Sequence, residues 1–391
     1  MKRLLFIVSG IVLGGFLSGC SSLSPLQRSK LITVNHLIDN SRYAEAKDIV
    51  EEMIEDEKTA QWSRTWYNRG NLSQTAYREG MQKNDRKMSE LYPDQLFLAF
   101  ESFEKAIELD KRGRLEEQLV PKYILLANDF QRLGERRFSS RNYDEALRAF
   151  EKGLEIIERP ALSSRLDTNL VYNAALAAYE AGKWDKAVKH LGRLHGYGHS
   201  ANVVHLLSDA YLQKGNIQAA EKTLREGIET FDNSEKLILL LADLLVENGK
   251  VEAALQVLDH AIAKDPANHT LHHTRGLVYQ KDGQFNDAIL AYFDANIHKP
   301  GQVRTLVNLA TCYYNLGVEI DEGTRTITNS STVQIERAKS AAAFESAINW
   351  LDQAYELEPR DQGILLEIYQ LYRMLRVTDK MRSIEGLITI P

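Results

Sequence analysis

The stretch that decides the fold covers residues 269–302 and reads HTLHHTRGLVYQKDGQFNDAILAYFDANIHKPGQ. Gly276 and Ala288 are small, which is what two helices need where they cross at close range. Two aromatic side chains supply bulk beside that crossing, Phe285 and Tyr292. Gly283 can adopt the left-handed conformation that ends a helix, and Pro300 stops the next one. The stretch therefore predicts two antiparallel helices joined by a tight turn.

The same pattern recurs along the chain with a nearly constant period. Glycines follow one another at intervals of 33, 34, 34 and 34 residues, at Gly182, Gly215, Gly249, Gly283 and Gly317. A second series marks the helix after each turn: Ala46, Ala99, Ala146, Ala187, Ala220, Ala254, Ala288 and Ala347. The middle intervals of this series are regular, whereas the first and last are longer. The chain is thus one helix pair repeated about eight times.

This period and residue set resemble the tetratricopeptide repeat, a helix–turn–helix unit of 34 residues. The resemblance covers roughly residues 27–361. It implies an all-α fold, a right-handed superhelical solenoid of antiparallel helix pairs. Residues 362–391 break the marker pattern, and we expect them to form C-terminal capping helices.

Two insertions interrupt the array. The first lies near residues 77–95 and is rich in charge, and the second lies near residues 318–341. The centre of the second, EGTRTITNSST, is polar and is expected to be a mobile loop. Insertions in solenoids often form binding surfaces, but we favour lengthened helices and a solvated loop, because solenoid loops tolerate added length.

The N-terminus resembles a segment that targets a protein to the cell envelope. Lys2 and Arg3 precede a 13-residue apolar run, which is shorter than the roughly 20 residues of a transmembrane helix. The run ends in Leu17-Ser18-Gly19-Cys20, which resembles a bacterial lipobox. We expect residues 1–19 to be a lipoprotein signal peptide, Cys20 to carry acyl chains such as palmitate, and residues 20–30 to form a tether. Alternatives are an ordinary secretory signal with a chance cysteine and a buried N-terminal helix.

The residues after the cysteine bear on location. Ser21 and Ser22 include no aspartate, which by analogy with Gram-negative sorting favours the outer membrane, with the protein facing the periplasm. Acylation of Cys20 would leave Cys312 without a disulfide partner. Cys312 falls on an apolar helical pattern, so a buried, inert thiol is expected there.

Composition excludes several classes of protein. The chain has 391 residues, of which 44% are hydrophobic and 26% charged, a globular balance. The formal net charge of −6 argues against nucleic acid as a partner. We find no phosphate-binding loop, metalloprotease motif, nucleophile elbow or Cys-x-x-Cys pair, and the repeats leave no room for a catalytic domain. No enzymatic activity and no cofactor are predicted.

Histidine groups provide the alternative hypothesis of a metal or small-ligand site. His190, His195, His199 and His205 lie within sixteen residues, and His269, His272 and His273 form a second group. Imidazoles can ligate zinc or copper, but no carboxylate or cysteine has ligand spacing beside them. We expect solvated surface residues and predict no metal site.

The family resemblance also implies where a partner binds. In tetratricopeptide solenoids the first helix of each unit lines a groove for partner peptides. By register the groove residues are Tyr172, Leu176, Tyr179, His205, Asp209, Leu212, Leu239, Asp243, His273, Leu277, Gln280, Arg304, Asn308 and Tyr314. The Lys and Asn pair of the clamp that some members use for a terminal carboxylate is missing at Tyr172/Leu176 and at His205/Asp209, so that clamp is not predicted.

The combined prediction is a non-enzymatic, lipid-anchored scaffold of the bacterial cell envelope. It would bind one or more envelope proteins or peptides, in outer-membrane assembly, secretion, export or a cell-wall complex. The sequence does not choose among these pathways.

Overall fold

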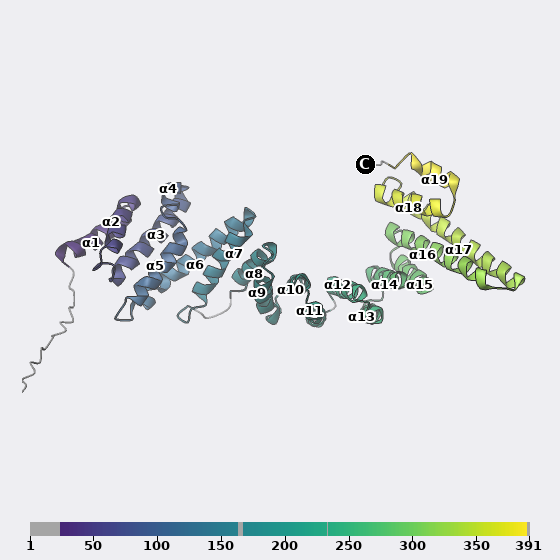
Figure 1. Ribbon diagram of the computed structural model, residues 1–391, viewed down its shortest axis with the longest axis horizontal. Helices are drawn as coiled ribbons and strands as arrows, with labels where there is room; N and C mark the ends of the chain where they lie inside the picture. Colours follow the sequence, from purple (N-terminus) through teal and green to yellow (C-terminus); the bar gives the residue numbers. More distant parts are fainter. Residues whose placement is uncertain (1–23, 163–166, 233, 389–391) are drawn as a thin grey trace, which may run out of the picture. The chain divides into compact units, whose positions relative to one another are not determined.

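The computed structural model describes residues 24–162, 167–232 and 234–388 and is built from helices, with no strand in those ranges. It divides into two compact units, residues 1–181 and 182–391. Figure 1 shows the helices of each unit following one another in chain order. The predicted all-α solenoid of helix pairs is confirmed.

The described part of the first unit contains three helix pairs and two further helices. α1 (Pro25–Asp39) packs on α2 (Tyr43–Glu55), α3 (Ser63–Lys83) on α5 (Gln95–Glu108), and α6 (Leu115–Ser139) on α7 (Tyr143–Ile157). A single turn, α4 (Arg86–Ser89), lies between α3 and α5, and α8 (Thr168–Glu180) packs on α7. The first helices of these pairs are therefore α1, α3 and α6.

The second unit begins with α9 (Trp184–Gly196) and continues as helix pairs. These are α10 (Ala201–Gln213) with α11 (Ile217–Thr230), α12 (Glu235–Glu247) with α13 (Val251–Lys264), α14 (His269–Lys281) with α15 (Phe285–His298), and α16 (Val303–Gly323) with α17 (Ser330–Leu357). The first helices α10, α12 and α14 also pack on one another in sequence. The last pair is α18 (Gln362–Met374) with α19 (Thr378–Glu385).

Close crossings inside the pairs explain the small residues of the repeat. A Cβ atom added to Gly276 would lie 2.7 Å from the Tyr292 ring, and one added to Gly134 would lie 2.5 Å from the Phe150 ring. Gly70 faces Phe103 in the same way, and Gly317 faces Phe344. The glycine of the first helix thus makes room for an aromatic ring of the second, as the stretch 269–302 predicted.

Glycine is also needed at the turn inside each regular repeat. Gly215, Gly249 and Gly283 have φ angles of +72°, +70° and +77°. These values lie in the left-handed region, where a side chain would be strained. The turn therefore reverses the chain within a few residues and places the second helix against the first.

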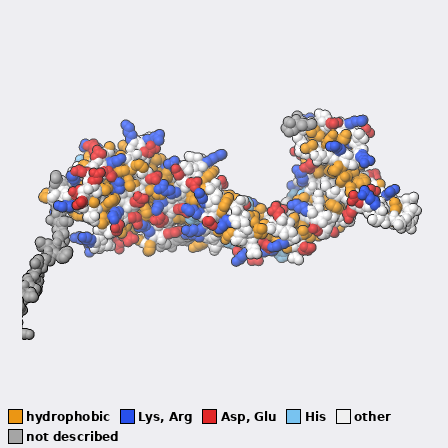
Figure 2. Space-filling view, in the orientation of Figure 1, with side chains coloured by type: hydrophobic (Ala, Val, Ile, Leu, Met, Phe, Trp, Pro, Cys, Tyr) orange, Lys and Arg blue, Asp and Glu red, His pale blue; other side chains and the backbone are white. Residues whose placement is uncertain are grey.

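The second insertion lengthens a helix pair. α16 runs to Gly323, a short 3₁₀ turn (η1, Thr324–Thr326) follows, and α17 begins at Ser330. The prediction of a mobile loop over EGTRTITNSST is wrong for most of its length, because the Asn329 side chain caps α17 by accepting from the amides of Ser331 and Thr332. Figure 2 shows the end of this hairpin mainly in white, the colour of the backbone and of uncharged polar side chains.

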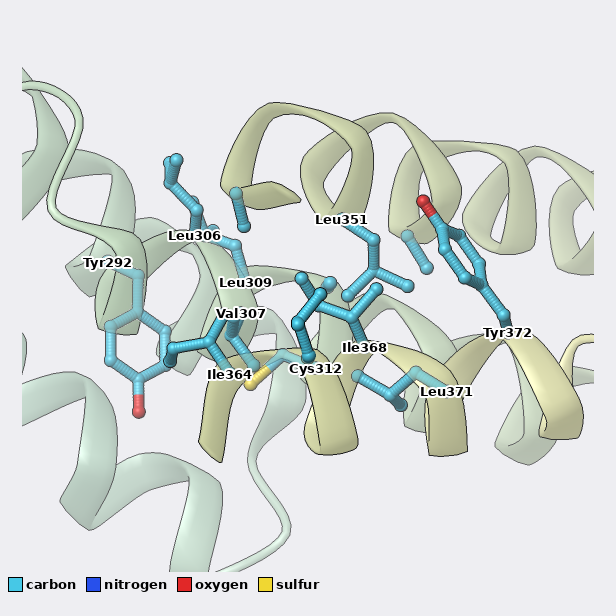
Figure 3. Packing of buried hydrophobic residues seen from close by; sticks show 14 of the residues in the cluster. Tyr292, Leu306, Val307, Leu309, Cys312, Leu351, Ile364, Ile368, Leu371 and Tyr372 are labelled. Atoms are coloured by element: carbon cyan, nitrogen blue, oxygen red, sulfur yellow. The ribbon is translucent and has the colours of Figure 1, made fainter. Parts of the chain in front are cut away.

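The C-terminal pair covers the apolar side of the α16–α17 pair. Ile364, Ile368 and Leu371 of α18 join a buried cluster with Leu309 and Cys312 of α16 and Leu351 of α17, as Figure 3 shows. Leu365 of α18 belongs to the same cluster. Asp352 of α17 accepts a hydrogen bond from Tyr372 and pairs with Lys380. The terminal helices therefore close this core.

Candidate partner-binding surfaces

A cavity of the first unit lies between two first helices, α3 and α6. It has a volume of about 1020 Å³. Its lining is mostly polar: Gln74, Thr75, Tyr77, Arg78, Glu79, Met81, Gln82, Lys83, Lys122, Asp129, Arg132 and Arg136. We call this cavity the α3–α6 pocket.

Hydrogen bonds connect the two helices at the base of the pocket. The Gln74 side-chain amide donates to the backbone oxygen of Lys122 at 3.1 Å and to an Asp129 oxygen at 3.4 Å. Lys122 Nζ in turn donates to Asn71 Oδ1 at 2.6 Å. Gln74 is only 1% exposed and Asp129 only 4%. Two adjacent repeats are thus joined here by buried polar groups, which are costly unless their hydrogen bonds are made.

Asp129 is the buried acid of this network. Its closest cation is Arg78, at 3.4 Å between Nε and Oδ1. Burial raises the pKa of Asp129 to about 6, although the charges of Arg78, Arg132 and Arg136 and the Gln74 amide oppose that rise. Burial together with the charge of Arg78 also lowers the pKa of Lys122. The base of the pocket therefore holds ionisable groups whose charged forms are poorly solvated.

The rim contains a second acid, Glu79, which is already well paired. It forms an ion pair with Lys83 and accepts hydrogen bonds from Tyr43 and Ser41. These partners lower the pKa of Glu79 to about 2, with the Lys83 hydrogen bond as the largest cause. Glu79 is consequently ionised and locally neutralised at neutral pH.

Sequence reasoning did not select the α3–α6 pocket, although a signal was present. Residues 77–83 belong to the first predicted insertion, and they form the last turns of α3 and one wall of the pocket. Lys122, Asp129 and Arg136 also recur every seven residues, which places them on one face of α6. A polar stripe on a first helix beside an insertion would have indicated the site.

In the first unit, three predicted groove residues lie on α8. Tyr172, Leu176 and Tyr179 are all partly exposed, while the alanines between them are buried. α8 begins at an N-cap in which Asp167 accepts from the amide of Leu170 at 3.0 Å. The capped helix thus presents two aromatic side chains and a leucine on one accessible face.

The remaining predicted groove residues lie on the first helices of the second unit. Leu212, Asp243 and Arg304 are exposed. The others are partly exposed: His205, Asp209, Leu239, His273, Leu277, Gln280, Asn308 and Tyr314. α10, α12, α14 and α16 therefore carry this set where a partner can reach it.

Several of these side chains also make contacts within the unit. His273 Nδ1 lies 2.9 Å from Thr305 Oγ1, and Gln280 accepts from the Tyr292 hydroxyl at 2.6 Å. Arg304 donates to Glu367 of α18 at 2.7 and 2.9 Å. Burial lowers the pKa of His273 and of His205, so both imidazoles favour the neutral form. This surface is accordingly firmly positioned by neighbouring helices.

The expectation of solvated surface residues is wrong for two of these histidines, His190 and His272, and holds for His199, which is exposed. His190 is 3% exposed on α9, and His272 is 6% exposed on α14, where its Nε2 lies 2.8 Å from the Pro266 carbonyl oxygen. Both fall on faces that pack into the repeat. His195 is paired with Glu226 at 3.1 Å. Across the described ranges, no three His, Cys, Asp or Glu side chains come together as metal ligands would.

Of the two cysteines, only Cys312 lies within the described residues. Cys312 is fully buried on α16, and burial raises the pKa of its thiol to about 12, as expected for an inert side chain. Cys20 and the rest of the predicted signal peptide lie outside the described residues. Within residues 24–162, 167–232 and 234–388, no helix combines the length and apolar character needed to cross a bilayer.

The stacked helix pairs and accessible first helices define a repeat scaffold of the α-solenoid class. Residues 167–310 match the family described as tetratricopeptide repeat-like domain. The TPR repeat-containing protein YpiA of Bacillus subtilis (strain 168) is 28% identical over 196 residues, which are 50% of this chain and 44% of that protein. The chain therefore matches less than half the length of this curated relative. Together with the repeat pattern, these matches support membership in the tetratricopeptide repeat family.

Solved structures are similar in outline only. The C-terminal part of a TPR repeat-containing protein from Cytophaga hutchinsonii aligns with a TM-score of 0.46 and 15% identity, covering 66% of this chain and 93% of that one. A TPR repeats protein from Bacteroides fragilis gives 0.34 and 20%, covering 63% and 98%. MamA gives 0.36 and 18%, covering 49% and 92%.

Proposed function

We propose that this protein is a non-enzymatic scaffold of the bacterial cell envelope that binds a partner protein and is held at a membrane by acylated Cys20. Tetratricopeptide repeats generally mediate protein–protein interactions. The observation that carries the proposal is the accessibility of the first helices. Every predicted groove residue on α8, α10, α12, α14 and α16 is at least partly exposed, while the small residues between them are buried.

The chemistry of this surface suits a polypeptide ligand. Leucine and tyrosine side chains offer apolar contact, and Asp243, Gln280 and Asn308 offer hydrogen bonds. Mixed aromatic, apolar and polar surfaces of this kind are typical of protein interfaces. The outer membrane, on its periplasmic side, is the location that the residues after Cys20 favour.

The alternative function, binding of a metal or small ligand through histidines, has no comparable support. His190 and His272 are buried in packing faces, His195 is paired with Glu226, and the described residues contain no cluster of three metal-ligating side chains. We do not pursue it.

Capture of a partner tests the groove. The full chain would be crosslinked in intact cells and recovered with its neighbours. The groove variant is Leu212→Ala with Asp243→Ala, two exposed positions on α10 and α12. We expect loss of a defined partner by roughly tenfold or more, because truncating residues central to an interface can each cost more than about 1 kcal/mol.

The matched control makes the same two kinds of substitution on a second helix. Leu290→Ala with Asp287→Ala changes exposed positions of α15. This variant should capture the partner as the wild type does. Equal loss in both variants, or no reproducible partner for the wild type, would contradict the proposed function.

A further inference from the structure

The residues that line the α3–α6 pocket precede all predicted groove residues in the sequence, and more of them are charged. Between these two first helices, the lining is dominated by charged and amide side chains. By contrast, α5 and α6 meet in an apolar cluster that includes Phe97, Phe103 and Phe130. A polar cavity of this size suits a ligand that forms hydrogen bonds or ion pairs with the side chains that line it.

The charges of the pocket are unequal. Five cations line it, Arg78, Lys83, Lys122, Arg132 and Arg136, against two acids, Glu79 and Asp129. Lys83 is paired with Glu79, and Arg78 with Asp129. In the part of the chain that the structure describes, no carboxylate forms an ion pair with Lys122, Arg132 or Arg136. The uncompensated charge in the pocket is therefore positive.

The cations are held in place by neutral partners, which leaves their charge available. Lys122 Nζ donates to the side-chain oxygen of Asn71. Arg136 donates to the Tyr77 hydroxyl, and its guanidinium lies over the Tyr77 ring, 5.9 Å from the centroid. Arg132 is exposed on the same helix. A ligand carboxylate would meet oriented donors without first breaking an ion pair.

Gln74 needs a hydrogen-bond donor from the ligand, whereas the cations of the pocket need an acceptor. Its side-chain NH₂ faces two acceptors, the Lys122 carbonyl and Asp129, so its Oε1 must point elsewhere. That buried Oε1 has no hydrogen-bond partner within the described protein. A buried acceptor of this kind gains from a donor. The pocket therefore favours a ligand with both negative charges and N–H groups.

From these features we propose that the α3–α6 pocket binds an acidic segment of a partner polypeptide, with Lys122, Arg132 and Arg136 contacting its carboxylates and Gln74 accepting from its backbone amide. The proposal rests on the proposed function in assuming a protein partner. The cavity volume of about 1020 Å³ exceeds what a single small anion fills and suits several residues of a peptide.

Direct binding tests this proposal. The probe is a fluorescent peptide of alternating Asp and Ser with both ends blocked, and the reference peptide has Asn in place of Asp. Binding to the full-length protein in nonionic detergent is followed by anisotropy. We expect the Asp peptide alone to bind, more weakly as ionic strength rises, because solvent-accessible charges are screened.

Two arginines of α6 provide a matched pair of variants. Arg132 lines the pocket, whereas Arg137 is exposed on the same helix and pairs with Glu145. Arg132→Gln should raise the dissociation constant of the Asp peptide roughly three- to tenfold, as loss of an interfacial charge does, and Arg137→Gln should leave it unchanged. The two variants have the same net charge, so a general electrostatic effect would change both equally and overturn the proposal.

Asp129 supplies a second readout. The groups that act on it are Arg78 and Gln74 from α3 and Arg132 and Arg136 from its own helix. Ionised Asp129 repels an acidic ligand. Affinity should therefore rise as the pH falls from about 7.5 to about 5.5, while peptide carboxylates stay ionised. Asp129→Asn should bind tightly at both values, and a retained pH dependence in this variant would count against the site.

Two further outcomes would reject the proposal. Vesicles rich in phosphatidylglycerol could bind in an Arg132-dependent manner while the Asp peptide does not, which would make the pocket a lipid-headgroup site. Inorganic phosphate could displace the peptide completely at low concentration, which would make it a small-anion site. If the wild-type protein captures its partner in cells but does not bind the Asp peptide, only this inference is lost and the scaffold function stands.

Discussion

At the scale of single residues, the glycines of the first helices have a demanding role. Gly276 lies against Tyr292 so closely that a methyl group would stand 2.7 Å from the ring. Tyr292 is fully buried, and its hydroxyl is fixed by Gln280, so the ring cannot easily move away. Overpacking of a rigid core site is destabilising even when the added group is small.

We therefore predict that Gly276→Ala lowers the free energy of unfolding by about 1–3 kcal/mol. Gly192→Ala is the control, because Gly192 lies in α9 with no atom within 4 Å of an added Cβ. There the change should stabilise by about 0.5–1 kcal/mol, since alanine favours helix over glycine. Thermal unfolding and hydrogen exchange in α14 and α15 measure both effects. A stabilising Gly276→Ala would show that the Tyr292 ring yields.

Residue patterns also mark the limit of prediction from sequence. The roles of Gly276, Gly283 and Ala288 could be predicted from the sequence, because those roles are set within one repeat. Gln74 and Asp129 did not, because their hydrogen bond joins residues 55 positions apart. A polar residue on a helix is usually exposed, and nothing near Asp129 in the sequence shows that it becomes buried.

At the scale of elements, the last helix pair closes a core that the regular repeats leave open. α18 inserts Ile368, which is 0% exposed, between α16 and α17. On the same helix Leu366 faces outward with 46% exposure. The Asp361 side chain caps α18 by accepting from the Ile364 amide at 2.9 Å. The element is thus fixed by its cap and by one apolar face.

The difference in burial between Ile368 and Leu366 predicts different effects of alanine substitution at the two positions. Ile368→Ala should destabilise by about 2–5 kcal/mol, through lost apolar burial and the cavity left behind. Leu366→Ala should change stability by less than about 0.5 kcal/mol. The thermal midpoint and the protection of α18 amides against exchange report the difference. Similar values for the two variants would mean that α18 does not hold the position seen in Figure 3.

The second insertion shows why the boundaries of helices are hard to predict from sequence. Polar composition indicated a loop over residues 322–332, yet Asn329 caps a helix of 28 residues there. Loop-like composition and a helix start share the same residues, because Ser, Thr and Asn suit both. Packing of α16 against α17 decides in favour of helix.

At the scale of the whole molecule, the proposed anchor sets where the repeats act. More than one acyl chain on Cys20 would give stable attachment, because each buried methylene contributes about 0.8 kcal/mol. The apolar run before Cys20 would be removed with the signal peptide. The predicted tether of residues 20–30 extends too far, because α1 already begins at Pro25.

Replacing the acceptor cysteine tests this anchor. In cells, Cys20→Ala should move the protein out of the membrane fraction and abolish labelling by an alkyne-bearing palmitate analogue, because the thiol is the only site for the thioether. Cys312→Ala is the control, and it should leave both labelling and fractionation unchanged, since that thiol is buried. Membrane retention and label in Cys20→Ala would contradict the predicted anchor.

The sequence alone determined the repeat, the helix pairs and the close crossings, because each depends on residues within one period of 34. It also placed the groove residues on first helices, since register follows from the same period. Only the tertiary structure decided the division into two units, the burial of His190 and His272, and the α3–α6 pocket. These depend on side chains brought together from separate repeats, whose approach is set by packing and not by local periodicity.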